Sequence, residues 1–406
     1  MIKITHFIEK DKQITAKVSF VFFVLAFFSL TFVPYFFPYD YYIVFLAFVF
    51  VAIIISALKF TLQIGIIPII LSVRIVYSLV NTMCKGIDVS LFIGQERVTF
   101  GAILVFLYAY NFIGKVKSEI RIAVALTSIA SGIQVIYTAM TSGGDKNLIG
   151  SAIGMSNYVA AILLICTVYY CFIKKTPFEI ALLVLDTVAF LITQSFGGYV
   201  AFLVLLIYLA ITKVNWKSKL TYIIVSAFVI CLPLIVLFSL KTGIGASFIH
   251  KILDKLAYLF SGNLNAFGSS RLELYGFSVK NIMKEPIFGI FINVDYNLPV
   301  DYRFQNFRTH NFVLESLLLY GIIGTILNGF LLYYIFKKGG KNPLKNPVKK
   351  ICFFAIVLGV FHGLIEPTLF TFNYETFFWT AVGLFVRDED KFGRTISFAD
   401  TVASRI

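Results

Sequence analysis

The chain has 406 residues, of which 59% are hydrophobic and only 14% are charged, and its mean hydropathy is +0.88. Soluble globular domains carry about 25% charged residues, so this composition excludes an ordinary soluble enzyme and predicts a polytopic membrane protein. The formal net charge of +14 follows membrane topology along the chain, as described below, and predicts contact with anionic lipid headgroups and no nucleic-acid partner.

The apolar runs predict an all-α bundle of about twelve transmembrane helices in a single transmembrane domain, residues 1–406. In chain order the predicted spans are 18–37, 41–58, 62–82, 98–114, 121–140, 154–173, 177–194, 197–212, 219–240, 311–336, 350–368 and 372–386. The region 177–212 is either two short spans that turn at residues 195–198 or one span followed by a re-entrant segment.

Lysine and arginine concentrate between alternate spans, and this orients the predicted bundle. If the N-terminus is cytoplasmic, the inside segments hold 23 of the 35 basic residues, whereas the short outside loops hold three. This asymmetry is typical of the positive-inside rule. We therefore expect both termini in the cytoplasm and one large hydrophilic loop, residues 241–310, on the outer face.

Several charged residues fall inside predicted spans. Arg74 lies about 12 Å from the outer end of its span, at 1.5 Å per residue, so it should face a cavity or a structural partner. His362 and Glu366 are four residues apart and therefore share one helical face. They either support an outer-face site or form a mutually satisfied structural pair. Asp186 needs a partner that the sequence does not identify, and the role of Asp40 in the first outer loop is equally open.

The outer loop contains a predicted helix. Ser270 and Glu273 fit a capping box, and the helix should run to about Lys284 because Pro286 cannot continue it. One apolar stripe would place this helix on the membrane or on top of the bundle; it consists of Leu272, Tyr275, Val279, Ile282 and Met283.

Arg271 would occupy the first turn of that helix, where free backbone N–H groups and the helix dipole also attract anions. A phosphate site is one interpretation, and a surface arginine or a partner for Glu273 is the other. Arg303 and Arg308 approach the next span from the same loop. Together the three arginines would surround a diphosphate, or they would hold lipid headgroups.

The span after the loop opens with His310, near Arg308, Asn311 and Glu315. In a continuous helix one face would read His310, Leu314, Leu317, Gly321, Gly324 and Asn328. The two glycines would let a neighbouring helix approach closely, so that the histidine tops a packed seam. We expect Glu315 to bond near Asn311 or an arginine. A histidine held at the outer membrane boundary suits proton transfer.

Two stretches resemble the O-antigen ligase and polysaccharide polymerase family. HNFVLESLLLYGIIG, from residue 310, resembles the family's histidine and Gly-x-x-Gly signature, and SSRLELYGFSVKNIMKEPIFGI, from residue 269, resembles its arginine, helix and Pro-x-x-Gly segment. The order of elements is similar over residues 150–386, and the specific motifs fall within 268–324. Residues 194–198 depart from the family pattern because they lack its arginine.

The resemblance implies a GT-C-like bundle that transfers glycan from undecaprenyl diphosphate to an acceptor hydroxyl on the outer face of a bacterial cytoplasmic membrane. It implies inversion at the anomeric carbon, without metal or cofactor. The catalytic candidates are His310, as base, and Arg271, which would stabilise the leaving diphosphate. The expected substrate-binding residues are Arg308, Arg303, Arg74, Asn311, Glu315, His362 and Glu366.

A repeat-unit polymerase for capsule, exopolysaccharide or O-antigen is the leading interpretation. Its donor and acceptor are both undecaprenyl-diphosphate-linked oligosaccharides, and a flippase and a chain-length regulator are candidate partners. A ligase that uses another acceptor is the first alternative. A flippase for lipid-linked oligosaccharides is the second, although a flippase has no need of the large outer loop.

Overall fold

The computed structural model describes residues 2–36, 41–113, 119–142, 148–151, 154–173, 176–213, 253–254, 257–258, 260–262, 271–290, 309–340, 343–366, 369 and 372–387. The predicted span 219–240 lies outside the described residues. So do Asp40, Ser270, Arg303 and Arg308.

Helices make up almost all of the described structure. They are α1 (Ile2–Phe36), α2 (Tyr41–Ala57), α3 (Ile66–Cys84), α4 (Val89–Asn111), α5 (Glu119–Thr141), α6 (Ser156–Phe172), α7 (Pro177–Ile192), α8 (Phe196–Lys213), α12 (Arg271–Ile282), α14 (Phe312–Lys338), α15 (Pro347–Gly363) and α16 (Phe372–Phe385). Between α5 and α6, the two-residue strands β1 (Gly150–Ser151) and β2 (Gly154–Met155) pair antiparallel.

The prediction of an all-α membrane protein is confirmed, but not the number of spans. Within the described ranges, five helices are long and apolar enough to cross a membrane, namely α1, α3, α4, α5 and α14, and α2, α6 and α8 are shorter apolar helices. The region 177–212 forms two helices, α7 and α8.

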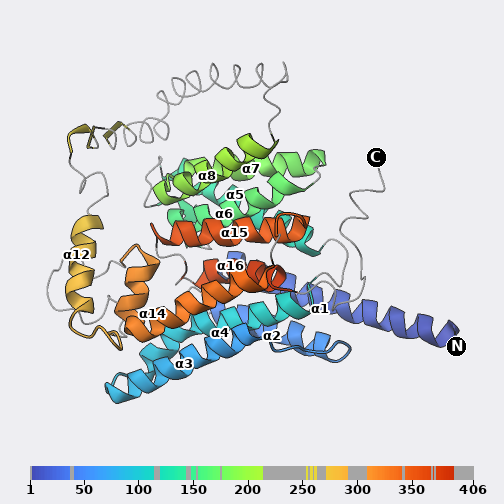
Figure 1. Cartoon of the computed structure of the whole chain (residues 1–406). Helices are drawn as coiled ribbons and strands as arrows, with labels where there is room; N and C mark the ends of the chain where they lie inside the picture. The colour runs from blue at the N-terminus through green and yellow to red at the C-terminus, as the bar shows by residue number, and fades with distance from the viewer. Residues whose placement is uncertain are drawn as a thin grey trace.

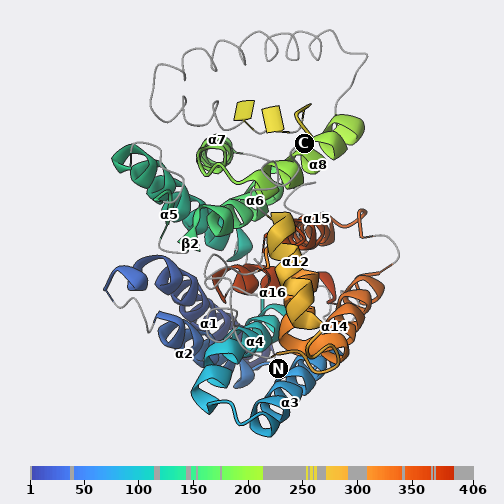
Figure 2. The ribbon, with the colours of Figure 1, turned by 90° about the vertical axis from the view of Figure 1, so that its left-hand side faces the viewer.

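The long helices run side by side, and α12 lies across one end of the bundle (Figure 1). The four helices from α1 to α4 share one apolar core with α14, α15 and α16. The four helices from α5 to α8 share a second apolar core with α15. Viewed from the end that carries α12, α15 and α16 lie between these two groups of helices (Figure 2). The helices between the groups therefore fix how the two cores sit relative to each other.

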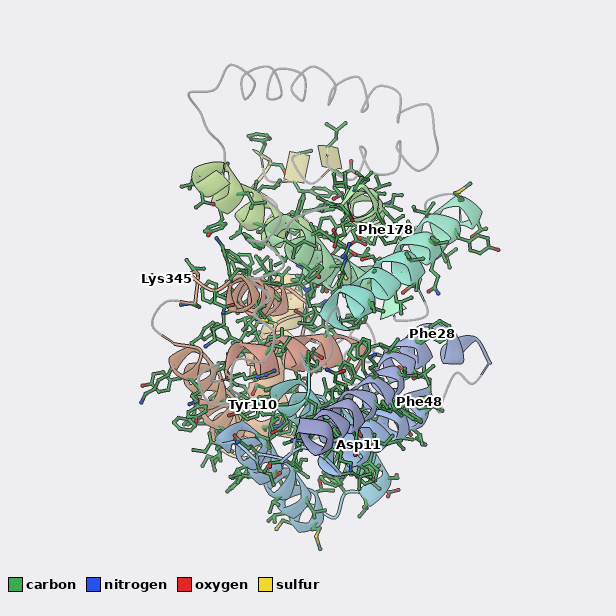
Figure 3. All side chains as sticks on the ribbon, turned by 90° about the vertical axis from the view of Figure 1, so that its right-hand side faces the viewer. Asp11, Phe28, Phe48, Tyr110, Phe178 and Lys345 are labelled. Atoms are coloured by element: carbon green, nitrogen blue, oxygen red, sulfur yellow. The ribbon has the colours of Figure 1, made fainter. Side chains whose placement is uncertain are left out.

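Large apolar side chains also cover the outside of the bundle. Phe28 on α1 is 45% exposed and Phe178 on α7 is 56% exposed, and both project from the ribbon (Figure 3). In water such a surface would favour aggregation, whereas lipid chains solvate it. Asp186, by contrast, is fully buried and accepts a hydrogen bond of 2.9 Å from Ser128 of α5, so α5 supplies the partner that the sequence left open.

Helix α12 begins at the predicted arginine and ends two residues before the predicted end. Its buried residues are Leu274, Ser278, Asn281 and Ile282, and Ile282 packs with Leu318 of α14. The predicted apolar stripe is divided, because Ile282 is buried whereas Leu272, Val279 and Met283 are exposed. The helix therefore rests on α14 and turns part of its apolar surface away from the bundle.

Helix α14 does not have the continuous face that the sequence suggested. It begins at Phe312 with Asn311 as N-cap, so His310 precedes the helix, and it is broken at Gly321, where φ is 63° and ψ is −165°. The prediction that His310 shares a helical face with Gly321 and Asn328 is therefore wrong. The cap side chain competes with helical hydrogen bonding before residue 312, and the break rotates the second half of the helix relative to the first.

Candidate functional site

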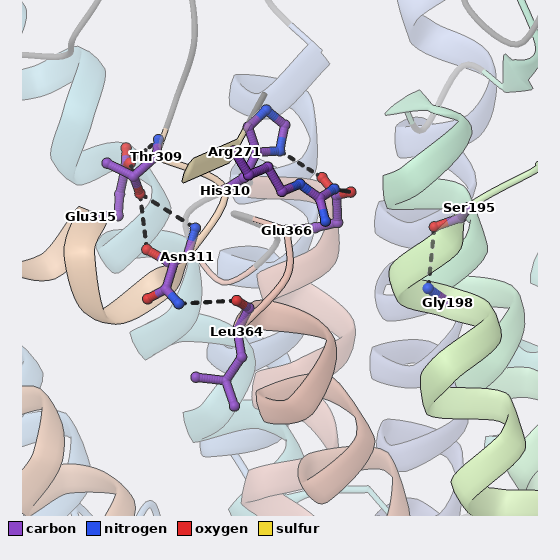
Figure 4. A network of polar contacts seen from close by, with 9 residues as sticks. All are labelled: Ser195, Gly198, Arg271, Thr309, His310, Asn311, Glu315, Leu364 and Glu366. Carbon is purple, nitrogen blue, oxygen red and sulfur yellow. Dashed lines mark hydrogen bonds and ion pairs between the residues drawn. The ribbon is translucent and has the colours of Figure 1, made fainter. Parts of the chain in front are cut away.

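Glu366 joins the two residues that the sequence singled out as catalytic candidates (Figure 4). Its Oε1 accepts a hydrogen bond from Nη2 of Arg271 at 2.5 Å, and its Oε2 lies 2.8 Å from Nδ1 of His310. The carboxylate is almost fully buried, whereas the side chains of Arg271 and His310 retain 20% and 27% of their exposure. Arginine and histidine therefore meet around one buried carboxylate and remain accessible from outside.

The backbone at His310 is held in an unusual conformation. Its φ of 53° lies in the left-handed region, which costs a residue other than glycine about 1–3 kcal/mol. Both neighbours are fixed: the Thr309 amide and hydroxyl donate to Glu315 Oε2, at 3.0 and 2.8 Å, and Asn311 caps α14. These bonds hold the strained residue in place and direct its ring toward Glu366.

Asn311 and Glu315 therefore hold the backbone on either side of His310 through their hydrogen bonds. The Asn311 Oδ1 accepts hydrogen bonds from the Val313 and Leu314 amides, and its Nδ2 donates to the Leu364 carbonyl at 3.0 Å. This last bond ties the start of α14 to the turn that carries Glu366. Glu315 was expected to bond near Asn311 or an arginine, and its described partner is Thr309, two residues before Asn311.

The charge on Glu366 decides the state of the histidine ring. Burial raises the pKa of Glu366, but the hydrogen bond from His310 and the positive charge of Arg271 outweigh it, so the pKa lies below its ordinary value. An ionised carboxylate only accepts hydrogen bonds, so Nδ1 of a neutral His310 ring must carry the proton. Nε2 then has the free lone pair, which is the arrangement a general base requires.

Arg271 is the first residue of α12. Its described partner is Glu366 and not Glu273, the alternative that the sequence offered. An arginine has five N–H donors in a planar fork, so one bond to Glu366 leaves donors for a second anion. Arg303 and Arg308, the other two arginines of the loop, lie outside the described residues.

The last turn of α15 holds the backbone of Glu366 in place. His362 is fully buried there, and its carbonyl accepts a 2.8 Å bond from the Glu366 amide. The helix ends at Gly363, so Glu366 stands in the turn that follows. Gly197, at the start of α8, packs against this turn: a Cβ there would lie 3.4 Å from Cγ of Glu366. The segment that lacks the family's arginine thus borders the site with a glycine.

Sequence reasoning placed Tyr275 only in the apolar stripe, and the structure puts it one turn along α12 from Arg271. Burial raises the pKa of Tyr275, and the charge of Arg271 only partly opposes this. The phenol therefore stays neutral at physiological pH. Tyr275 is four residues after Arg271, so both side chains lie on one face of the helix. This spacing was the signal in the sequence that could have placed Tyr275 beside Arg271.

Arg74 belongs to a different polar cluster, buried between α3, α4 and α14. It donates to Asn328 at 3.2 Å and to Thr99, and its guanidinium lies over the ring of Tyr320. Thr99 in turn donates to Glu96 at 2.6 Å. These partners favour the structural interpretation of Arg74 that the sequence offered beside a cavity role.

We expect Arg74→Met to lower the free energy of unfolding by about 3–5 kcal/mol. The substitution removes the positive charge of a buried network and leaves the negative charge of Glu96 without compensation. Thermal unfolding in detergent measures the loss, with Lys337→Met at the end of α14 as the control. Turnover per folded molecule should change little. Normal stability with lost turnover would instead place Arg74 in substrate binding.

Residues 181–329 match the model of a protein family described as O-antigen ligase. The matched region includes Arg271 and His310 and ends before Glu366. No curated protein matches the chain. The resemblance drawn from the two motifs is thus confirmed: residues 181–329 of the chain are similar to the O-antigen ligase family.

Proposed function

We propose that this protein is a glycosyltransferase that polymerises lipid-linked oligosaccharide repeat units at the outer face of the cytoplasmic membrane. The donor is a glycan on undecaprenyl diphosphate, and the acceptor is a sugar hydroxyl of a second lipid-linked unit. The product is a capsular, exo- or O-polysaccharide. The single observation that carries this proposal is the contact of His310 and Arg271 with the same buried carboxylate of Glu366.

The arrangement suits an inverting displacement. Nε2 of His310 takes the proton of the acceptor hydroxyl as its oxygen attacks the anomeric carbon. The bond between that carbon and the diphosphate oxygen breaks on the opposite side, and the electron pair leaves with the diphosphate. The free N–H groups of Arg271 stabilise the charge that grows on the departing group. No step calls on a metal or cofactor.

The remaining residues fit this division of labour. Glu366 keeps Nδ1 of His310 protonated and orients Arg271, while Thr309, Asn311 and Glu315 hold the histidine backbone. Positive-inside topology puts both termini in the cytoplasm and this site outside. There the lipid-linked substrates arrive from a flippase, and a chain-length regulator is a further candidate partner.

A ligase is the second candidate, because the matched family is described by that activity. It would carry out the same displacement with a different acceptor. Both activities require His310 and Arg271, so the acceptor alone separates them.

Cells that make only Arg271→Ala test the proposal. We expect turnover to fall about 10²- to 10³-fold, as when a donor to a developing negative charge is removed. Polymer should disappear while single lipid-linked units still reach the outer face. Lys280→Ala, a change on the exposed face of the same helix, is the matched control and should leave polymer intact.

Two other outcomes contradict polymerisation. Units trapped on the inner face would indicate a flippase. Polymer that is made but never joined to its final acceptor would indicate a ligase. Lipid extraction, combined with labelling of outer-face glycans by an impermeant reagent, separates these results.

A further inference from the structure

The segment after α12 enters the break in α14. Gly289 has a φ of 73° and Gly321 a φ of 63°, and their backbones touch. A Cβ on Gly321 would meet the Ile287 carbonyl and would lie 2.5 Å from the Gly289 nitrogen. A Cβ on Gly289 would meet the Gly321 nitrogen and would lie 2.7 Å from the Leu319 carbonyl oxygen. Each glycine therefore occupies the space that a side chain on the other would need.

Hydrogen bonds cross this contact in both directions. The Ile322 and Ile323 amides of α14 donate to the carbonyls of Pro286 and Ile287, at 2.9 and 3.3 Å, and the Ile290 amide donates to the Leu318 carbonyl at 2.7 Å. A broken helix leaves backbone groups without their usual partners, which is costly at membrane depth. Here the inserted segment supplies those partners.

Helix α3 fastens the same contact from the other side. The Tyr77 hydroxyl donates to the carbonyls of Phe288 and Tyr320, at 3.2 and 2.9 Å, and Asn81 donates to the Phe288 carbonyl at 2.9 Å. Lys85 pairs with Glu285 and also donates to the Gly289 carbonyl. Three separate parts of the chain thus meet around Gly289 and Gly321.

We propose that Gly289 and Gly321 are positioning residues for the transfer reaction: their interlocked contact sets the orientation of α12 and so the place of Arg271 relative to His310. This inference rests on the proposed function for its catalytic meaning, but its structural part does not. The contact lies beyond the C-terminal end of α12, and Arg271 lies at the other end.

The length of α12 explains why a small change at the glycine contact would displace Arg271. Its twelve residues span about 18 Å, so a rotation of about 6° at the contact would move Arg271 by about 2 Å. Misplacement of a catalytic group by about 1 Å can lower a rate about 10²-fold. The Arg271 bond to Glu366 holds only the far end of α12, so the orientation of the near end depends on the glycine contact.

Amide hydrogen exchange of the full chain in lipid nanodiscs tests the structural part without any substrate. In Gly289→Ala and Gly321→Ala, we expect the amides of residues 271–282 to exchange about tenfold faster, because a left-handed backbone strains alanine and loosens the contact. The matched controls are Gly276→Ala on α12 and Gly329→Ala on α14, where an added Cβ meets nothing within 4 Å. Both controls should exchange like the natural chain.

A second variant covers the case in which alanine disrupts the whole fold. Tyr77→Phe adds no atom and removes two of the hydrogen bonds from α3, so it should speed exchange over residues 271–290 while α4 and α16 stay protected. Unchanged exchange of α12 in Tyr77→Phe and in both glycine variants would overturn the proposal.

Turnover of undecaprenyl-diphosphate-linked glycan tests the catalytic meaning. We expect kcat of the glycine variants to fall about 10²-fold with little change in KM, since the arginine is displaced but the rest of the site is kept. A natural chain with no turnover would refute the proposed function, whereas the exchange result would still decide the role of the two glycines. Normal kcat together with loosened α12 would overturn the positioning role.

Discussion

Replacement of His310 by alanine should lower turnover about 10²- to 10⁴-fold, the usual contribution of a general base. The affinity for the lipid-linked donor should change little, because in the proposed reaction His310 acts on the acceptor hydroxyl. Turnover of purified protein in nanodiscs with a labelled lipid-linked oligosaccharide measures both quantities. His6→Ala, near the start of α1, is the matched control.

Added imidazole sharpens this experiment. Removal of the ring leaves space in front of Glu366, and a free imidazole that binds there can accept the acceptor's proton. We expect imidazole to restore part of the activity of His310→Ala and to leave Arg271→Ala unchanged. Near-normal turnover of His310→Ala without imidazole would remove His310 from the reaction.

Replacement of Glu366 by glutamine should have a comparably large effect although the two side chains have nearly the same shape. The amide has no charge to hold Arg271, and its N–H₂ group can donate to Nδ1 of His310. Nε2 would then carry the proton and lose its capacity as a base. In catalytic triads, the corresponding wrong tautomer lowers kcat about 10⁴-fold, so we expect a loss of about 10²- to 10⁴-fold here. Glu273→Gln, an exposed change on α12, is the control.

Acid stability provides an independent measurement of Glu366. Its pKa is below the ordinary value of 4.5 in the folded protein. The folded state therefore binds the proton less readily than the unfolded state. The stability that Glu366 contributes is fully present above pH 4.5 and is lost as pH falls through the folded pKa. The melting temperature of the natural chain should thus fall more between about pH 5 and pH 3 than that of Glu366→Gln. Parallel pH profiles would show that the carboxylate is not held by His310 and Arg271.

Much of this protein could be predicted from local patterns. The apolar runs gave the helices of the bundle because length and hydropathy suffice to mark an apolar helix. The start of α12 at Arg271 and its end before Pro286 agree with the predicted bounds of the helix. His310 was recognised because it stands beside an apolar segment in a recognisable motif. Each of these features depends on residues close together in the sequence.

Other predictions from the sequence were wrong or incomplete, and there is a physical reason for this. A helical wheel placed His310 on α14, whereas Asn311 caps the helix and leaves the histidine in a left-handed conformation before it. Gly321 was read as a site of close helix approach, and it does allow a close approach, but of the backbone at Gly289. A wheel assumes unbroken helical dihedrals, and both the cap and the break violate that assumption.

The sequence by itself determined that this is an all-α membrane protein. It also identified His310 and Arg271 as the candidate catalytic residues, since hydropathy, capping and motifs are properties of short segments. Only the tertiary structure decided that Glu366 joins His310 to Arg271 and that Arg74 belongs elsewhere. Those pairings connect residues 56, 95 and 254 positions apart. At such separations the packing of whole helices, and no local periodicity, chooses which side chains meet.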